Sequence, residues 1–129
     1  MTATRCDVLV AGGGLVGLSL APALARAGLS VALVDRAPVD TVPADPATID
    51  PRVYAISPGS VAFLEAQRAW SALPADRMQA VEAMRVEGDR GAVLEFSAHD
   101  VGVRALAWIV EAREIRAALV PRVRDEGVV

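Results

Sequence analysis

The chain has 129 residues, of which 53% are hydrophobic and 22% charged, and its formal net charge is −3. This length is enough for one domain, and the apolar content is enough for a packed core. A chain that is disordered over most of its length is therefore excluded. The acidic balance, without a lysine- or arginine-rich block, excludes a general affinity for nucleic acid.

The N-terminal part predicts a strand, a helix and a second strand. Residues 7–11 form a short apolar run that stops at glycine, as a buried strand does. Apolar residues then recur at helical spacing, and Gly28 is well placed to end that helix. Residues 30–35 form a second buried strand. A βαβ unit over 7–35 implies a right-handed parallel crossover, although Pro22 predicts a kink in its helix.

The remaining chain predicts a proline-rich loop, two further helices, a hairpin and a strand. Ser57 and Pro58 are typical of an N-cap and a first helical turn. Alternating apolar and polar residues on both sides of Gly-Asp-Arg-Gly indicate the hairpin, and Pro121 interrupts the pattern of the last helix. The expected elements are the loop 37–51, helix 58–73, hairpin 84–96, strand 106–110 and helix 111–125, with 127–129 as the start of a third parallel strand.

A glycine motif lies between the first strand and the first helix. Gly12, Gly14 and Gly17 occupy the fixed places of G-x-G-x-x-G. In that pattern the first glycine permits the tight turn, the second lets a pyrophosphate approach, and the third lets helix and strand pack closely. Asp35 ends the second strand and can accept hydrogen bonds from an adenosine ribose, while its charge disfavours a 2′-phosphate. The motif therefore predicts a site for FAD or NAD.

Longer segments resemble a known family. Residues 11–18 and 27–36 resemble the opening of the p-hydroxybenzoate-hydroxylase-like flavoproteins. Residues 50–57 (Asp-Pro-Arg-Val-Tyr-Ala-Ile-Ser) and 106–111 (Leu-Ala-Trp-Ile-Val-Glu) resemble the ubiquinone-biosynthesis hydroxylase subfamily. The resemblance covers nearly the whole chain. It implies an α/β fold: the N-terminal part (1–129) of a Rossmann-like FAD-binding domain with an inserted β-hairpin and helices, incomplete because the family's later flavin-contacting and substrate-binding segments are absent.

The same resemblance implies a set of residues that bind FAD. The glycines would cradle the pyrophosphate, the aspartate would hold the ribose, and the arginines would lie near the adenine end and the flavin. For Arg36 and Arg52 the alternative is a solvated loop arginine. Ala112 stands where some relatives have a polar flavin contact. The expected cofactor-binding residues are Gly12, Gly13, Gly14, Gly17, Asp35, Arg36, Arg52 and Arg113. The sequence identifies no catalytic side chain and no metal site.

The activity implied by the resemblance is aromatic hydroxylation. A flavin-dependent monooxygenase would use NAD(P)H as a transient reductant and oxygen to hydroxylate a small aromatic substrate, a ubiquinone precursor. The single cysteine, Cys6, favours a reducing, cytoplasmic location, and association of the whole enzyme with a membrane surface or a biosynthetic complex stays open. The 129-residue chain alone is expected to be inactive.

Three alternatives remain at this stage. One is a different FAD- or NAD-dependent oxidoreductase that shares the glycine turn. Another is a nucleotide-binding remnant without catalytic function. The third is an exported protein whose first helix is a signal peptide, although three consecutive glycines and Pro22 interrupt that segment.

Overall fold

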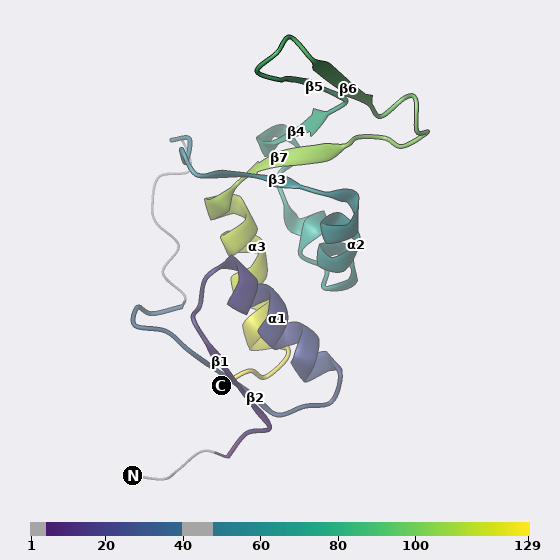
Figure 1. Ribbon diagram of the computed structural model, residues 1–129. Helices are drawn as coiled ribbons and strands as arrows, with labels where there is room; N and C mark the ends of the chain where they lie inside the picture. The colour runs from purple at the N-terminus through teal and green to yellow at the C-terminus, as the bar shows by residue number, and fades with distance from the viewer. Residues whose placement is uncertain (1–4, 40–47) are drawn as a thin grey trace.

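The computed structural model describes residues 5–39 and 48–129. It is a mixed α/β structure with a parallel strand pair, a three-stranded antiparallel sheet and a separate hairpin (Figure 1). Within the described ranges, no helix has the length and hydropathy that are needed to cross a membrane. The elements are β1 (Val8–Ala11), α1 (Leu15–Arg26), β2 (Val31–Val34), β3 (Val53–Ile56), α2 (Pro58–Ala66), η1 (Trp70–Ala72), η2 (Ala75–Arg77), β4 (Met78–Val81), β5 (Ala83–Glu87), β6 (Val93–Ser97), β7 (Ala107–Glu111) and α3 (Ala112–Asp125).

The predicted βαβ unit is confirmed. β1 and β2 pair in parallel, from Val8 opposite Val31 to Ala11 opposite Val34. α1 connects them and lies beside α3 (Figure 1). Both helices continue through the prolines that the sequence places inside them, Pro22 and Pro121. The parallel pair and its crossover helix thus form the frame that carries the glycine turn.

The C-terminal residue continues the parallel pair on its other side. Val129 donates its N–H to the Val31 carbonyl at 3.1 Å and accepts from the Leu33 N–H at 2.7 Å. Val129 thus bonds to Val31 and Leu33, the residues before and after Ala32. This is the hydrogen-bond pattern of parallel strands. These two bonds agree with the expectation that 127–129 starts a third parallel strand, although residues 127–129 are not themselves part of a strand.

The antiparallel sheet has the order β3-β7-β4, so β7 is its central strand. The sequence predicted β7, one residue earlier than it lies, but neither of its partners. Both β3 and β4 are only four residues long, and β3 is largely exposed, so neither has the buried alternation by which a strand is recognised. The predicted hairpin is confirmed, with Ala83 opposite Ser97 and Glu87 opposite Val93.

The helix predicted over 58–73 was too long. α2 ends at Ala66, and Arg68 has a φ of 58°, which is left-handed. The Ala69 N–H then donates back to the Leu64 carbonyl at 2.9 Å, which closes the helix end. The redirected chain places the ring of Trp70 edge-on to Trp108, with 5.7 Å between ring centroids. The break in the helix thus comes with the packing of two aromatic rings. Local periodicity in the sequence does not reveal this tertiary contact.

One hydrophobic core joins α1, α2 and α3 to the parallel pair and to the three-stranded sheet. Leu18 from α1, Leu119 from α3 and Val110 from β7 each have 0% of their surface exposed. Leu18 follows directly on Gly17, so the packing of the core and the position of the glycine turn are linked.

We expect Leu18→Ala to lower the free energy of unfolding by about 2–5 kcal/mol, because a fully buried leucine loses its contacts and leaves a cavity. Leu20→Ala is the matched control, since Leu20 lies in the same helix but is 43% exposed. Urea denaturation followed by circular dichroism measures both. Equal losses in the two variants would show that α1 is not anchored through Leu18.

Candidate functional site

The turn from β1 into α1 has a geometry that only glycine permits at two positions. Gly12 has a φ of 110°, a backbone conformation that residues with a side chain rarely adopt. A Cβ placed on Gly17 would lie 1.9 Å from the Gly12 carbonyl oxygen and 3.4 Å from Val10. The roles predicted for these two glycines, a tight turn and close packing of helix on strand, agree with this geometry.

Gly14 differs from Gly12 in its ordinary φ of −76°, and from Gly17 in facing open space. A Cβ on Gly14 would meet nothing within 4 Å. Gly14 is also the N-cap of α1, which has no side-chain cap and no acidic residue in its first turn. The first amides of a helix have no partner inside the helix, and they lie at the positive end of its dipole. An uncapped, unobstructed helix start of this kind suits an anion such as a phosphate.

The backbone amides of the turn are not equally available. Gly12 donates its N–H to the Val34 carbonyl at 2.8 Å, and Gly13 donates its N–H to Asp35 Oδ2 at 2.6 Å. These two bonds hold the turn against the end of β2. Donors toward a ligand therefore begin at Gly14 and continue into the first turn of α1, while Gly12 and Gly13 shape the backbone.

Asp35 is the acceptor that fixes the turn. Its Oδ1 accepts the Ala37 N–H at 2.8 Å, and its Oδ2 accepts the Gly13 N–H. The Ala37 and Gly13 amides hold the pKa of this carboxyl below its usual value, and the charges of Arg36 and Arg116 act in the same direction. Asp35 is exposed and therefore stays ionised at neutral pH. Each oxygen has a further lone pair, which can accept a ribose hydroxyl.

Arg36 lies beside this carboxylate. It lines a hollow of about 480 Å³ together with Gly12 and Asp35, at the C-terminal ends of β1 and β2. Ligands of open parallel sheets bind at this end of the strands. The structure thus brings together the glycine turn, the aspartate and one of the predicted arginines.

Arg116, from α3, is a residue of the turn that the sequence analysis missed. It donates through Nη1 to the Gly13 carbonyl at 2.6 Å and through Nη2 to the Val39 carbonyl at 2.8 Å. A weak signal was present: Arg116 stands four residues from Ala112 and from Val120, which are both buried. A charge within a buried helical stripe requires partners, but the sequence does not say which.

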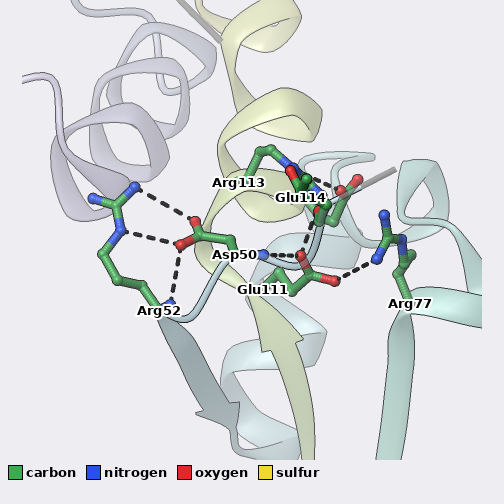
Figure 2. Close-up of polar contacts among 7 residues, drawn as sticks. Asp50, Arg52, Arg77, Glu111, Arg113 and Glu114 are labelled. Carbon is green, nitrogen blue, oxygen red and sulfur yellow. Dashed lines mark hydrogen bonds and ion pairs between the residues drawn. The ribbon is translucent and has the colours of Figure 1, made fainter. Parts of the chain in front are cut away.

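Arg52 belongs to a second group of polar residues, at the start of β3 (Figure 2). Its Nε and Nη2 donate to the two oxygens of Asp50, at 3.3 and 3.4 Å. The Asp50 side chain is only 9% exposed, and the Arg52 amide is the main cause that keeps the pKa of this carboxyl low. Arg52 itself is 72% exposed. Its guanidinium is thus oriented by Asp50 but remains accessible to an anionic ligand.

Glu111 is the buried centre of this group. One carboxylate oxygen accepts Arg77 Nη1 at 3.0 Å, and the other accepts the Asp50 N–H at 2.7 Å and Arg113 Nη2 at 3.2 Å (Figure 2). The side chain is 9% exposed. A carboxylate buried to this extent is stable only when it is paired and hydrogen-bonded. Glu111 therefore fixes the segment that carries Asp50 to the junction of β7 and α3.

Arg113 lies within the same network. Only 10% of its side chain is exposed, and it also donates to Glu114 Oε1 at 3.2 Å and to the Thr48 carbonyl at 2.6 Å. The sequence analysis expected Arg113 among the cofactor-binding residues. The structure places its guanidinium on protein acceptors that hold residues 48–50, so α3 contacts this segment through Arg113 and the glycine turn through Arg116.

The chain is similar to known proteins of one family. The family model described as "FAD binding domain" matches residues 5–117. The ubiquinone biosynthesis monooxygenase COQ6 of Drosophila melanogaster is 33% identical over 110 residues, which are 81% of this chain and 23% of that protein. The 3-demethoxyubiquinol 3-hydroxylase of Escherichia coli is 30% identical over 119 residues, 92% of this chain and 30% of that protein.

A solved structure extends the comparison. The complex of aklavinone-11 hydroxylase with FAD and aklavinone matches with a TM-score of 0.63 and 25% identity, over 99% of this chain and 25% of that one. The chain thus spans less than a third of the length of each of these proteins.

Gly17→Ala should destabilise the fold by about 3 kcal/mol, at the upper end of the usual range for overpacking, because the obstructing atom is a backbone oxygen. Gly14→Ala should cost less than about 1 kcal/mol, since its methyl group enters open space and only the preference at the N-cap changes. Thermal and urea denaturation compare the two variants. A Gly17→Ala chain as stable as the wild type would mean that α1 does not lie this close to β1.

Glu111→Gln should lower the free energy of unfolding by about 3 kcal/mol, because Arg77 and Arg113 would lose a buried countercharge. Glu95→Gln serves as the control: Glu95 also pairs with an arginine, Arg85, but its side chain is 67% exposed. An exposed pair of this kind contributes about 0–1 kcal/mol. Urea denaturation distinguishes the two, and similar small losses would contradict a central role for Glu111.

Proposed function

This chain belongs to the family of FAD binding domains, and we propose that it binds the ADP half of FAD across the glycine turn and the end of β2. FAD is the cofactor expected from the sequence, and the family match confirms it. The Gly14 amide and the first turn of α1 contact the pyrophosphate. Asp35 accepts from the ribose hydroxyls, and Arg36 lies along the adenine end.

The open, uncapped start of α1 is the observation that carries this proposal. Gly14 leaves space that any side chain would fill, and no acidic residue of the first turn opposes an anion. The amides beyond Gly13 are therefore placed to donate to phosphate oxygens without any rearrangement of the turn. Gly12, Gly13 and Gly17 contribute by fixing the backbone.

The two remaining arginines take different parts in the proposal. Arg52 is accessible, and Asp50 orients it, so its guanidinium reaches toward the cofactor and forms a charge-assisted contact there. Arg113 is nearly buried on Glu111 and Glu114, so we assign it to positioning the segment that carries Asp50 and Arg52.

For the whole protein we propose a flavin-dependent monooxygenase that hydroxylates an aromatic ring, with a ubiquinone precursor as substrate and NAD(P)H as reductant. The resemblance to ubiquinone-biosynthesis hydroxylases, expected from residues 50–57 and 106–111, is confirmed by the relatives of that name. The bound flavin supplies the redox chemistry and the activation of oxygen. The residues of this chain hold the nucleotide end of the cofactor and fix its position. That the chain alone is inactive stays a prediction.

Gly14→Val should raise the dissociation constant for ADP and for FAD at least about tenfold, or about 1.4 kcal/mol, because the side chain occupies the space of a phosphate. Asp35→Asn should raise it about tenfold, as expected when a hydrogen bond to a charged group is weakened. Titration calorimetry or flavin fluorescence gives both constants.

Gly59→Val is the matched control for these variants. Gly59 also faces open space at a helix start, in α2, and it lines neither of the hollows that border the glycine turn. It should leave nucleotide binding unchanged. If Gly14→Val bound ADP as tightly as this control, the phosphates would not lie at the glycine turn.

A further inference from the structure

Gly13 is held at both of its polar backbone groups by side chains from distant parts of the chain. Its N–H donates to Asp35 Oδ2 at 2.6 Å, and its carbonyl accepts from Arg116 Nη1 at 2.6 Å. The two partners come from the end of β2 and from α3, 22 and 103 residues away in the sequence. The orientation of the peptide that follows Gly13 is thus set by Arg116 as much as by the turn itself.

The direction of the Gly14 amide follows from this contact. The described peptide bonds contain no cis form, and in a trans peptide the carbonyl and the next N–H point in opposite directions. Because the Gly13 carbonyl points toward Arg116, the Gly14 N–H points away from it. Gly14 borders the open groove beside α1, where a Cβ would meet nothing within 4 Å.

The second arm of Arg116 makes this orientation rigid. Nη2 donates to the Val39 carbonyl at 2.8 Å, so one planar guanidinium spans the glycine turn and the segment after β2. The approach is close, since a Cβ on Gly13 would lie 3.0 Å from the Val39 side chain. A part-buried guanidinium bound to two carbonyls has little freedom to move, and its charge polarises the Gly13–Gly14 peptide so that the Gly14 N–H becomes a stronger donor.

We propose that Arg116 is a positioning residue of the nucleotide site, which aims the Gly14 N–H at the pyrophosphate by holding the Gly13 carbonyl. The inference rests on the proposed function, because it concerns the same phosphate position. Arg116 acts through the backbone and does not itself touch the nucleotide. Its effect is therefore confined to ligands that carry the diphosphate.

The test compares ADP with adenosine, which has the ribose but no phosphate, as probes of the 129-residue chain. Arg116→Met removes the donors and keeps an apolar side chain, and it should raise the dissociation constant for ADP about tenfold while adenosine binds as before. Arg116→Lys should recover part of the affinity for ADP, because an ammonium can donate to one of the two carbonyls. Arg122→Met is the control, since Arg122 lies in α3 but pairs with Asp125.

A spectroscopic measurement separates positioning from a loss of stability. In ¹⁵N-labelled protein, ADP should shift the Gly14 amide proton downfield in the wild type and in the Arg122→Met control, but not in Arg116→Met. The Gly12 amide, which is bonded to Val34, should keep its position in all of them. Urea denaturation is recorded for each variant, and Arg116→Gln, which keeps a polar group, replaces Arg116→Met if the latter does not fold.

Two results would overturn the inference, and they are distinguishable. If the wild type binds ADP and shifts the Gly14 amide, but the Met or Gln variant does so equally, Arg116 does not position the site and the proposed function stands. If the wild type neither binds ADP nor shifts the Gly14 amide, the proposed function fails and the inference fails with it.

Discussion

The contact between Gly17 and the Gly12 carbonyl is the constraint from which the rest of the site follows. A Cβ on Gly17 would come within 1.9 Å of that oxygen, so α1 can begin this close to β1 only with glycine there. The close start directs the helix dipole and its free amides to the C-terminal ends of the parallel strands. It also sets Leu18 into the core, with none of its surface exposed.

α3 links the glycine turn to the polar group at the start of β3. Its first turn carries Arg113, which holds the segment before β3, and Arg116 on the next turn holds the glycine turn. Glu111, the N-cap of this helix, is nearly buried and paired with two arginines. Since a buried charge that loses its partner is costly, this network couples the position of Arg52 to the packing of β7 and α3.

The surroundings of the turn combine charged and apolar surface. On one side lie Asp35 and Arg36, and on the other an apolar groove continues along α1 to Tyr54. Val16, on this side of α1, is 81% exposed, and Tyr54 is 49% exposed. Charged and apolar surfaces thus meet at the glycine turn. The fold therefore offers both kinds of contact along one surface.

The sequence alone determined the features that depend on neighbouring residues. The βαβ unit, the hairpin and the glycine turn with Asp35 follow from local periodicity and from backbone conformations that only glycine adopts. Tertiary structure decided what depends on distant partners. β3 and β4 exist because β7 lies between them, and α2 ends at Ala66 where the chain turns back into the core. Arg116 serves the turn, and Arg113 serves the segment before β3, because α3 folds back over residues that lie 65 to 103 positions earlier. Hydrogen bonds across such separations produce no periodic pattern in the sequence, because the packing of helices and sheets determines which residues become partners.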